Sequence, residues 1–211
     1  MHLLLAGATG LVGSHVLRLA LDDARVTRIT APVRRALALQ HDKLQAPLVD
    51  YDALPEDAPW WRADAVICAL GSTMKVAGSE AAFARIDHDY PLALAQRARD
   101  AGTPTYVLNS AMGADTRSRF FYNRVKGALE RDLAQLGFAS LTYARPGLIK
   151  GQRAVVRPTE AASMALLAAL GPLLPRRWRL CPAPAIARAM LDAACQARPG
   201  VHVIPAADLT R

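Results

Sequence analysis

The chain has 211 residues, 52% of them hydrophobic, and a formal net charge of +8 at pH 7. This length and composition predict a single globular domain and exclude an intrinsically disordered chain. The basic residues are spread along the sequence without a run of five like charges. The charge therefore suits an anionic ligand such as a phosphorylated cofactor, and does not indicate a nucleic-acid-binding tail.

The cysteines and the apolar segments indicate the cellular setting. Cys68, Cys181 and Cys195 are odd in number and lack CxxC spacing, so neither a disulfide framework nor a metal site is expected. The first apolar run breaks into glycines too early for a signal peptide, and the longest uncharged stretch, Ala161–Pro175, is too short for a transmembrane helix. These features predict a cytoplasmic protein without a transmembrane segment.

Apolar runs and amphipathic stretches alternate along the chain. Continuous apolar runs predict buried strands, and apolar residues at helical spacing predict helices. The expected strands are Leu3–Ala6, Val26–Val33, Pro47–Val49, Ala65–Leu70, Thr105–Asn109, Leu141–Ala144 and Gly200–Ile204. The expected helices are Leu11–Leu21, Ser79–Ala101, Phe120–Leu136, Glu160–Leu170 and Ala185–Ala197. This order predicts an α/β fold, a doubly wound parallel sheet with helices on both faces.

The region after the sixth strand differs in character from the rest. We expect residues 1–211 to form one domain in which residues 152–184 make a small C-terminal substrate lobe near the carboxyl ends of the strands. Within it, segment 161–179 joins an apolar stretch to the basic run Arg176–Arg179. This segment can be a core-packed helix with a basic loop, a lid, a dimer surface or a peripheral membrane contact. A monomer or a homodimer is expected.

Three glycines separate the first strand from the first helix. A helix N-terminus presents unpaired N–H groups and a positive dipole end, which suit a pyrophosphate. Gly7 permits the tight turn, Gly10 lets the backbone approach the phosphates, and Gly13 lets the helix pack on the strand. An ordinary glycine-rich turn is the alternative. The candidate cofactor-binding residues of this turn are Gly7, Thr9, Gly10, Leu11, Val12 and Gly13.

The end of the second strand favours NADP(H) over NAD(H). NAD sites place an acidic residue there, but this chain has Arg34 and Arg35, and a guanidinium can bind a 2′-phosphate. Arg34 is the better candidate, since one of the two is expected to start a surface helix. Asp50 could reach the adenine amino group. Ala69, Leu70 and Gly71 end the fourth strand, where small residues let an adenosine lie close.

A candidate catalytic group follows the fifth strand. Tyr122 and Lys126 are four residues apart on a predicted helix and share one face. An ammonium near a phenol favours the phenolate, so Tyr122 is a candidate proton donor or acceptor. Ser110 closes the fifth strand at the crevice where such sheets bind ligands and could hydrogen-bond a substrate carbonyl.

Several stretches in this order carry a family resemblance. They are GATGLVG, CALGSTMKVAGS, IDHDYPLALAQRARDAG, LNSAMGAD, FFYNRVKGALE, YARPGLIKG and, more loosely, PAPAIARAM. Together they resemble the short-chain dehydrogenase/reductase superfamily, and more narrowly its atypical NAD(P)-binding branch with the Tat-interactive-protein-like oxidoreductases.

The resemblance implies a Rossmann-like domain that binds NADPH, with Ser110, Tyr122 and Lys126 as the reductase triad. In such enzymes the tyrosine protonates the carbonyl oxygen, the lysine also binds the nicotinamide ribose, and the serine orients the carbonyl. The segment Arg145, Pro146 and Gly147 matches the one beside the nicotinamide. This chain departs from the family at Asp87, where many members carry asparagine, and at Ala111, where a second serine often follows the first.

Two functions fit these observations. One is an NADPH-dependent oxidoreductase that transfers a hydride to the carbonyl of a small, apolar substrate. The other is a non-catalytic NADP(H)-binding sensor or scaffold protein. A nucleic-acid partner is not expected, because nothing in the sequence supplies an element that reads a groove.

Overall fold

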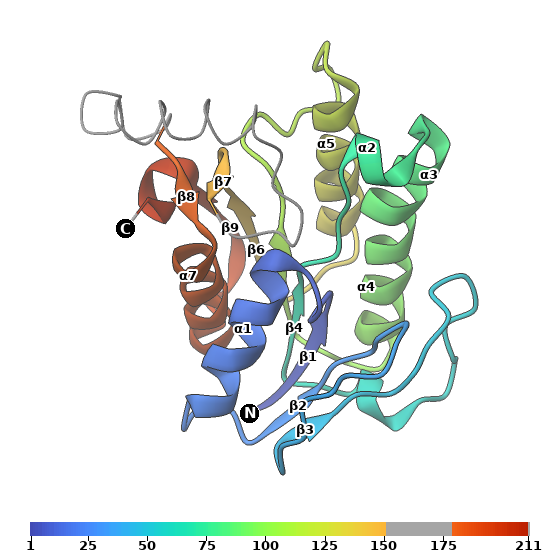
Figure 1. The fold of residues 1–211 in the computed structure, drawn as a ribbon, viewed down its shortest axis with the longest axis vertical. Helices are drawn as coiled ribbons and strands as arrows, with labels where there is room; N and C mark the ends of the chain where they lie inside the picture. The colour runs from blue at the N-terminus through green and yellow to red at the C-terminus, as the bar shows by residue number, and fades with distance from the viewer. Residues whose placement is uncertain (151–178, 211) are drawn as a thin grey trace.

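A computed structural model describes residues 1–150 and 179–210 of the chain (Figure 1). In this part the main sheet has seven strands, all parallel, in the order β3-β2-β1-β4-β5-β6-β9. They are β3 (Leu44–Gln45), β2 (Arg28–Thr30), β1 (His2–Ala6), β4 (Ala65–Cys68), β5 (Thr105–Asn109), β6 (Ser140–Arg145) and β9 (Gly200–Pro205). The strand order reverses between β1 and β4, which is where open parallel sheets form a ligand-binding crevice.

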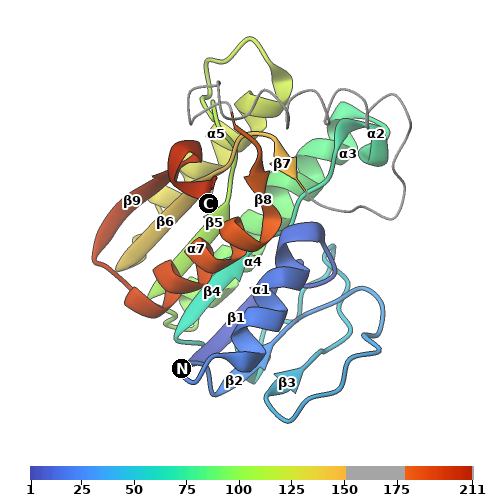
Figure 2. The same ribbon diagram turned by 60° about the vertical axis from the view of Figure 1, so that its left-hand side comes forward.

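Helices cover both faces of this sheet (Figure 2). Helices α1 (Leu11–Asp22) and α7 (Ala183–Gln196) lie on one face, and α4 (Tyr90–Asp100) and α5 (Phe121–Ala134) lie on the other. Successive strand side chains point to opposite faces, so Leu3 and Leu5 join the α1–α7 core while Leu4 joins the α4–α5 core. Burial on both sides explains why the strands read as continuous apolar runs, and the predicted doubly wound α/β fold is confirmed.

The second and third strands are shorter than the sequence predicts. The expected third strand, Pro47–Val49, contributes only a single bridge between Leu48 and Val33, and β3 forms earlier, at Leu44–Gln45. Proline has no N–H to donate, so the ladder is interrupted at Pro47, between β3 and the Leu48 bridge. The strand expected at Val26–Val33 is regular only in β2.

The helix expected at Ser79–Ala101 contains an irregular turn. It is divided into α3 (Glu80–Ala84), the π-helical turn η2 (Arg85–Asp89) and α4. The N–H of Tyr90 bonds to the carbonyl of Arg85, five residues earlier, which marks the widened turn. Pro91 follows directly and has no N–H for the carbonyl four residues before it, a usual setting for such a distortion. A short helix α2 (Met74–Ala77) precedes α3. The described residues also contain the single 3₁₀ turns η1 (Pro59–Trp61) and η5 (Ala206–Leu209).

The predicted substrate lobe falls largely on residues that are not described. The expected helix Glu160–Leu170 lies outside the described residues, as does segment 161–179 apart from its last residue. The described end of the lobe contains β8 (Cys181–Pro182), which pairs in parallel with β7 (Ile149–Lys150) just after β6. Within residues 1–150 and 179–210, no helix is long and apolar enough to cross a membrane.

The connection from β6 to β9 has the opposite hand from the others. Moving outward from β4 to β5 to β6, the chain passes through α4 and α5 on one face, yet α7 between β6 and β9 packs beside α1 on the other face. Crossover connections between parallel strands of one sheet are almost always right-handed, so the left-handed connection from β6 to β9 is an exception. As a consequence α7 does not cover β9 on the α5 side, where Val201 and Val203 remain 58% and 46% exposed.

Candidate cofactor and active site

The glycine turn after β1 is shaped by close backbone contacts. Gly7 has a φ of +85°, and a Cβ there would lie 2.6 Å from the carbonyl carbon and oxygen of Ala69. A Cβ on Gly13 would lie only 2.0 Å from the carbonyl oxygen of Gly7. The N–H of Gly10 donates to that same carbonyl at 2.9 Å. Any side chain at Gly7 or Gly13 would thus force the turn, β4 and α1 apart.

The N-terminus of α1 opens onto this turn. Gly10 is the N-cap and offers no side-chain oxygen, and the first turn of this described helix contains no acidic residue. Its first N–H groups and the positive end of its dipole are therefore available to an anion. Thr9 is exposed and Leu11 half-buried at the mouth, while the Val12 side chain packs into the core and offers only its backbone. The residues present fit the pyrophosphate of a dinucleotide.

The predicted adenosine contacts lie around the ends of β2 and β4. Arg34 and Arg35 are both exposed directly after the Val33 bridge, and neither forms an ion pair with another described residue. Asp50 is exposed, but its Oδ1 accepts the N–H of Asp52 at 2.9 Å, so this oxygen already stabilises a turn. Ala69 and Leu70 are half-buried and Gly71 is exposed.

Tyr122 and Lys126 share the inward side of α5, as the sequence predicts. The Lys126 ammonium lies 2.8 Å from Asp87 Oδ1, and both side chains are buried. Burial by itself lowers the pKa of Lys126, but the Asp87 carboxylate and, after it, the Tyr122 hydroxyl raise it overall. The ring of Tyr122 is 37% exposed and packs against Phe83, with ring centroids 5.5 Å apart. The phenol is therefore open to a ligand, while the lysine is held beneath it.

Ser110 occupies a different environment from the one expected. Its side chain is buried, and its hydroxyl donates to Glu130 Oε1 at 2.5 Å. Glu130 also accepts two hydrogen bonds from the Arg145 guanidinium, one of them from Nε to Oε1 at 3.0 Å. To orient a substrate carbonyl, the Ser110 hydroxyl would have to leave Glu130. The following residue is the buried Ala111, which has no hydroxyl to replace it.

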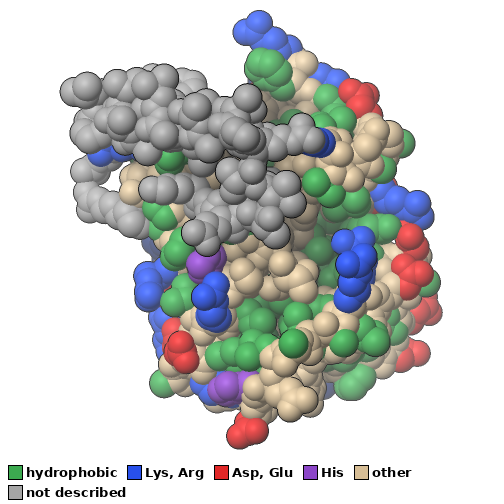
Figure 3. All heavy atoms as spheres, in the orientation of Figure 1, with side chains coloured by type: hydrophobic (Ala, Val, Ile, Leu, Met, Phe, Trp, Pro, Cys, Tyr) green, Lys and Arg blue, Asp and Glu red, His purple; other side chains and the backbone are tan. Residues whose placement is uncertain are grey.

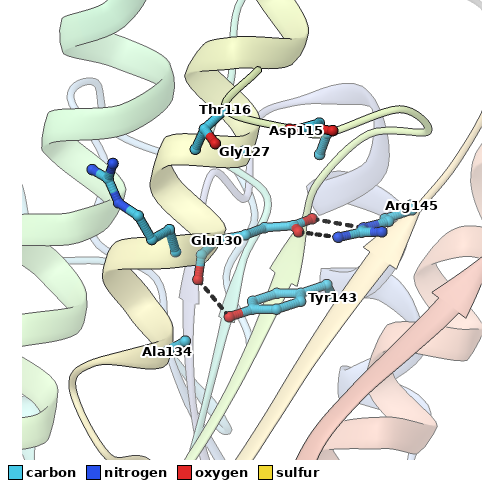
Figure 4. Close-up of a pocket in the computed structure, with 9 residues that line it drawn as sticks. Asp115, Thr116, Gly127, Glu130, Ala134, Tyr143 and Arg145 are labelled. Atoms are coloured by element: carbon cyan, nitrogen blue, oxygen red, sulfur yellow. Dashed lines mark hydrogen bonds and ion pairs between the residues drawn. The ribbon is translucent and has the colours of Figure 1, made fainter. Parts of the chain in front are cut away.

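Glu130 is the residue that sequence reasoning missed. It follows Lys126 by four residues, so the spacing Tyr122, Lys126, Glu130 marks one helix face and is the signal that could have revealed it. Its carboxylate joins α5 to β6 through Arg145, and its backbone carbonyl accepts the Tyr143 hydroxyl at 2.7 Å (Figure 4). The hydrogen bonds that Arg145 donates to the Glu130 carboxylate raise the pKa of Arg145, and burial raises the pKa of Tyr143.

This cluster lines a shallow pocket of about 330 Å³ between α5, β6 and the segment Ala114–Thr116. The Glu130 carboxylate and the Arg145 guanidinium at its centre already bind each other, so this ion pair links α5 to β6. The side chain of Arg145 points to Glu130, which leaves the backbone of residues 145–147 to approach a cofactor. Pro146 is buried and Gly147 half-buried, and the Pro146 carbonyl accepts the N–H of Met112 at 2.8 Å.

The described charged side chains do not form one basic surface on the face shown in Figure 3. On the face shown in Figure 3, the described basic side chains are separated from one another, and acidic side chains lie along the margin of the same face. On this face the described positive charge is therefore distributed, in keeping with the spread of basic residues along the sequence. A small anionic ligand in the crevice accounts for it better than an extended polyanion.

The segment that begins with the glycine turn is similar to known proteins. A protein-family model described as NAD(P)H-binding matches residues 7–136, more than half of the chain. The chain belongs to this NAD(P)H-binding family. The match begins at Gly7 and extends past Lys126, so it includes both the turn and the helix that carries the candidate catalytic residues.

Several curated relatives of this family member are fungal proteins. It is 40% identical over 176 residues to "Protein fmp52, mitochondrial" of Emericella nidulans, covering 79% of this chain and 75% of that protein. It is 38% identical over 167 residues to the protein of the same name in Aspergillus fumigatus, covering 75% and 70%. Their names contradict the expected cytoplasmic location, which is wrong. The cysteine pattern used for that expectation does not distinguish the cytoplasm from an organelle.

Solved structures share the fold of this NAD(P)H-binding protein at low identity. MoeE5 in complex with UDP-glucuronic acid and NAD has a TM-score of 0.74 at 19% identity, covering 97% of this chain and 75% of that one. The oxidoreductase ylbE from Lactococcus lactis has a TM-score of 0.59 at 18% identity, covering 91% and 97%. The Rossmann-like fold and the resemblance to the short-chain dehydrogenase/reductase type are thus confirmed. The chain has the NAD(P)-binding fold of oxidoreductases and epimerases.

Proposed function

We propose that this chain is an NADPH-dependent oxidoreductase of the atypical short-chain dehydrogenase/reductase type, which reduces a carbonyl of a small substrate to a hydroxyl. The observation that carries the proposal is the pair on α5, with a partly exposed Tyr122 one helical turn from the buried Lys126 that pairs with Asp87. The pair lies on the α5 side of the crevice that begins at the glycine turn. A pure binding module has no need for a proton donor there.

Each part of the site has a proposed task. The backbone at Gly7, Gly10 and Gly13 holds the pyrophosphate at the N-terminus of α1. When bound, NADPH supplies a hydride. Tyr122 gives a proton to the carbonyl oxygen. Lys126 binds the nicotinamide ribose, and its positive charge favours the phenolate form of Tyr122. Ser110 remains a proposed carbonyl contact that must first release Glu130.

The preference for NADPH rests on Arg34. Arg34 and Arg35 are exposed at the end of β2, where a 2′-phosphate would lie, and no acidic residue stands beside them in the chain. A guanidinium meets a phosphate through two parallel hydrogen bonds. We further propose that residues 1–211 act as one domain, with residues 152–184 as the substrate lobe.

Titration with NADPH and NADH tests the cofactor part. We expect wild type to bind NADPH more tightly than NADH, and Arg34→Ala to remove most of that difference. Arg117→Ala serves as the control, since the Arg117 side chain is 91% exposed and pairs with Asp115 on the segment before α5 rather than following β2. Equal binding of both nucleotides by wild type would remove the Arg34 assignment, and binding of neither would remove the proposed function.

A carbonyl-substrate screen with Tyr122→Phe tests the reaction. The variant should keep NADPH affinity and lose most of the reductase activity, while Tyr90→Phe, whose hydroxyl binds Asp52, should keep both. The engagement of Ser110 by Glu130 and the presence of Ala111 favour the second candidate, a non-catalytic NADP(H)-binding sensor. Unchanged turnover in Tyr122→Phe would refute the assigned acid, and tight NADPH binding without turnover on any carbonyl would favour the sensor.

A further inference from the structure

The partner of Lys126 is a fully engaged carboxylate. The Lys126 and Asp87 side chains are 3% and 1% exposed, and Nζ lies 2.8 Å from Oδ1. The second oxygen, Oδ2, accepts the backbone N–H of Ser72 at 2.7 Å. One carboxylate therefore connects the lysine on α5 to the chain segment that leaves β4.

Gly71 closes the pair from the crevice side. A Cβ at this position would lie 3.0 Å from Asp87 Oδ1 and 3.7 Å from Lys126 Nζ. The backbone at Gly71 thus passes directly over the two charges. Gly71 is also one of the proposed cofactor contacts, so the ion pair lies immediately beneath the proposed ligand site.

The widened turn η2 gives Asp87 its place. Phe83 and Asp87 are four residues apart on the α3–η2 helix, and they face Tyr122 and Lys126, which are four apart on α5. Phe83 packs against the Tyr122 ring, and Asp87 binds the Lys126 ammonium. Two matched contacts therefore orient the proposed proton donor and its lysine together.

The groups that face Lys126 come from three elements. They are Asp87 on η2, Tyr122 on α5 and Cys68 on β4. Burial raises the pKa of the Cys68 thiol, which keeps it neutral, so Asp87 is the carboxylate that compensates the ammonium. Burial alone lowers the pKa of Lys126, and the Asp87 carboxylate more than offsets it with the help of Tyr122. A buried lysine without such a partner tends to lose its proton.

We propose that Asp87 is a positioning residue that keeps Lys126 charged inside the protein and holds it beneath Gly71. The inference rests on the proposed function for the tasks of Lys126 and Tyr122, but the ion pair itself can be tested without cofactor or substrate. Asp87→Asn keeps the shape and an oxygen for the Ser72 N–H, yet leaves the ammonium unpaired. Asp89→Asn is the matched control, because Asp89 lies on the same turn and is 63% exposed.

The first test is urea unfolding of the cofactor-free protein from about pH 7 to about pH 10. In wild type the pKa of Lys126 lies above its unfolded value, so its stabilising effect is present through this range and is lost only at higher pH. In Asp87→Asn the unpaired lysine has a lowered pKa, so the folded protein sheds its proton as the pH rises and regains stability. We therefore expect the gap between the two unfolding midpoints to narrow with pH, whereas Asp89→Asn should follow wild type. A gap that is constant with pH would overturn the proposal, because a purely structural contact would give that result.

Two further measurements complete the test. Adding Lys126→Met to Asp87→Asn removes the lone charge, so this double variant should show no narrowing relative to wild type. NADPH affinity should be steady with pH in wild type and weaken several-fold toward high pH in Asp87→Asn. Persistent narrowing in the double variant, or pH-independent NADPH affinity in Asp87→Asn, would refute the role of Asp87. Failure of wild type to bind NADPH would refute the proposed function alone, and the unfolding data would still decide the role of Asp87.

Discussion

Replacing Gly13 by alanine should destabilise the protein even though the position is helical. Alanine is favoured over glycine in a helix by about 1 kcal/mol. Against this, the new Cβ would lie 2.0 Å from the Gly7 carbonyl oxygen and 2.7 Å from its carbon. Both are backbone atoms and cannot rotate away, so α1 must shift off the turn. Overpacking of this kind costs about 1–3 kcal/mol or more, and the net loss should be about 1–2 kcal/mol.

Gly10→Ala is the matched comparison for this prediction. Its Cβ would lie 3.3 Å from the same oxygen, a contact that small adjustments relieve, so its cost should stay below about 1 kcal/mol. The free energy of unfolding is measured by urea denaturation and the affinity for NADPH by nucleotide fluorescence. We expect Gly13→Ala to lose stability and NADPH binding together, and Gly10→Ala to lose mainly binding. An unchanged unfolding midpoint in Gly13→Ala would refute the close-packing argument.

The remaining predictions concern three ion pairs. Glu130→Gln should lower the free energy of unfolding by about 1–3 kcal/mol, less than for a fully buried pair because the Arg145 side chain keeps 34% of its surface in water. Glu56→Gln, which breaks the exposed Glu56–Arg97 pair, should cost less than about 1 kcal/mol, and equal effects of the two variants in urea denaturation would contradict this assignment. The Arg25 hydrogen bonds lower the pKa of Asp23 from 3.8 to about 2. The stability from this carboxylate is thus complete above about pH 4 and lost as the pH falls toward about 2. Thermal unfolding across this range should therefore show a smaller loss for Asp23→Asn than for wild type, and identical losses would count against the pair.

Local patterns predicted most of the regular elements. Strand β5 begins and ends as expected at Thr105–Asn109, and α5 and α7 begin and end within about two residues of the expected bounds. These segments have strong periodicity or continuous apolar runs, which depend on nearest neighbours in the chain. The predicted elements differ from the structure where a proline interrupts regular hydrogen bonding, as at Pro47 and at the widened turn before Pro91.

The candidate site divides in the same way. The glycine turn and the Tyr122–Lys126 spacing can be read from the chain, because each lies within a few consecutive residues. The partners of these groups cannot. Asp87 lies 39 residues before Lys126 and meets it only because η2 packs against α5. Glu130 captures Ser110 across 20 residues and Arg145 across 15, through the packing of α5 on β5 and β6.

By itself, the sequence determined the parallel α/β architecture, the glycine turn between β1 and α1, and the helix face that carries the proposed proton donor. All of these follow from periodicity, glycine placement and spacing, which act locally along the chain. Only the tertiary structure decided that Lys126 is buried and paired, that Ser110 binds Glu130, and that α7 packs beside α1 and leaves β9 open on the α5 side. The protonation and availability of a polar group depend on burial and on neighbours distant in the chain, and the fold alone brings those neighbours together.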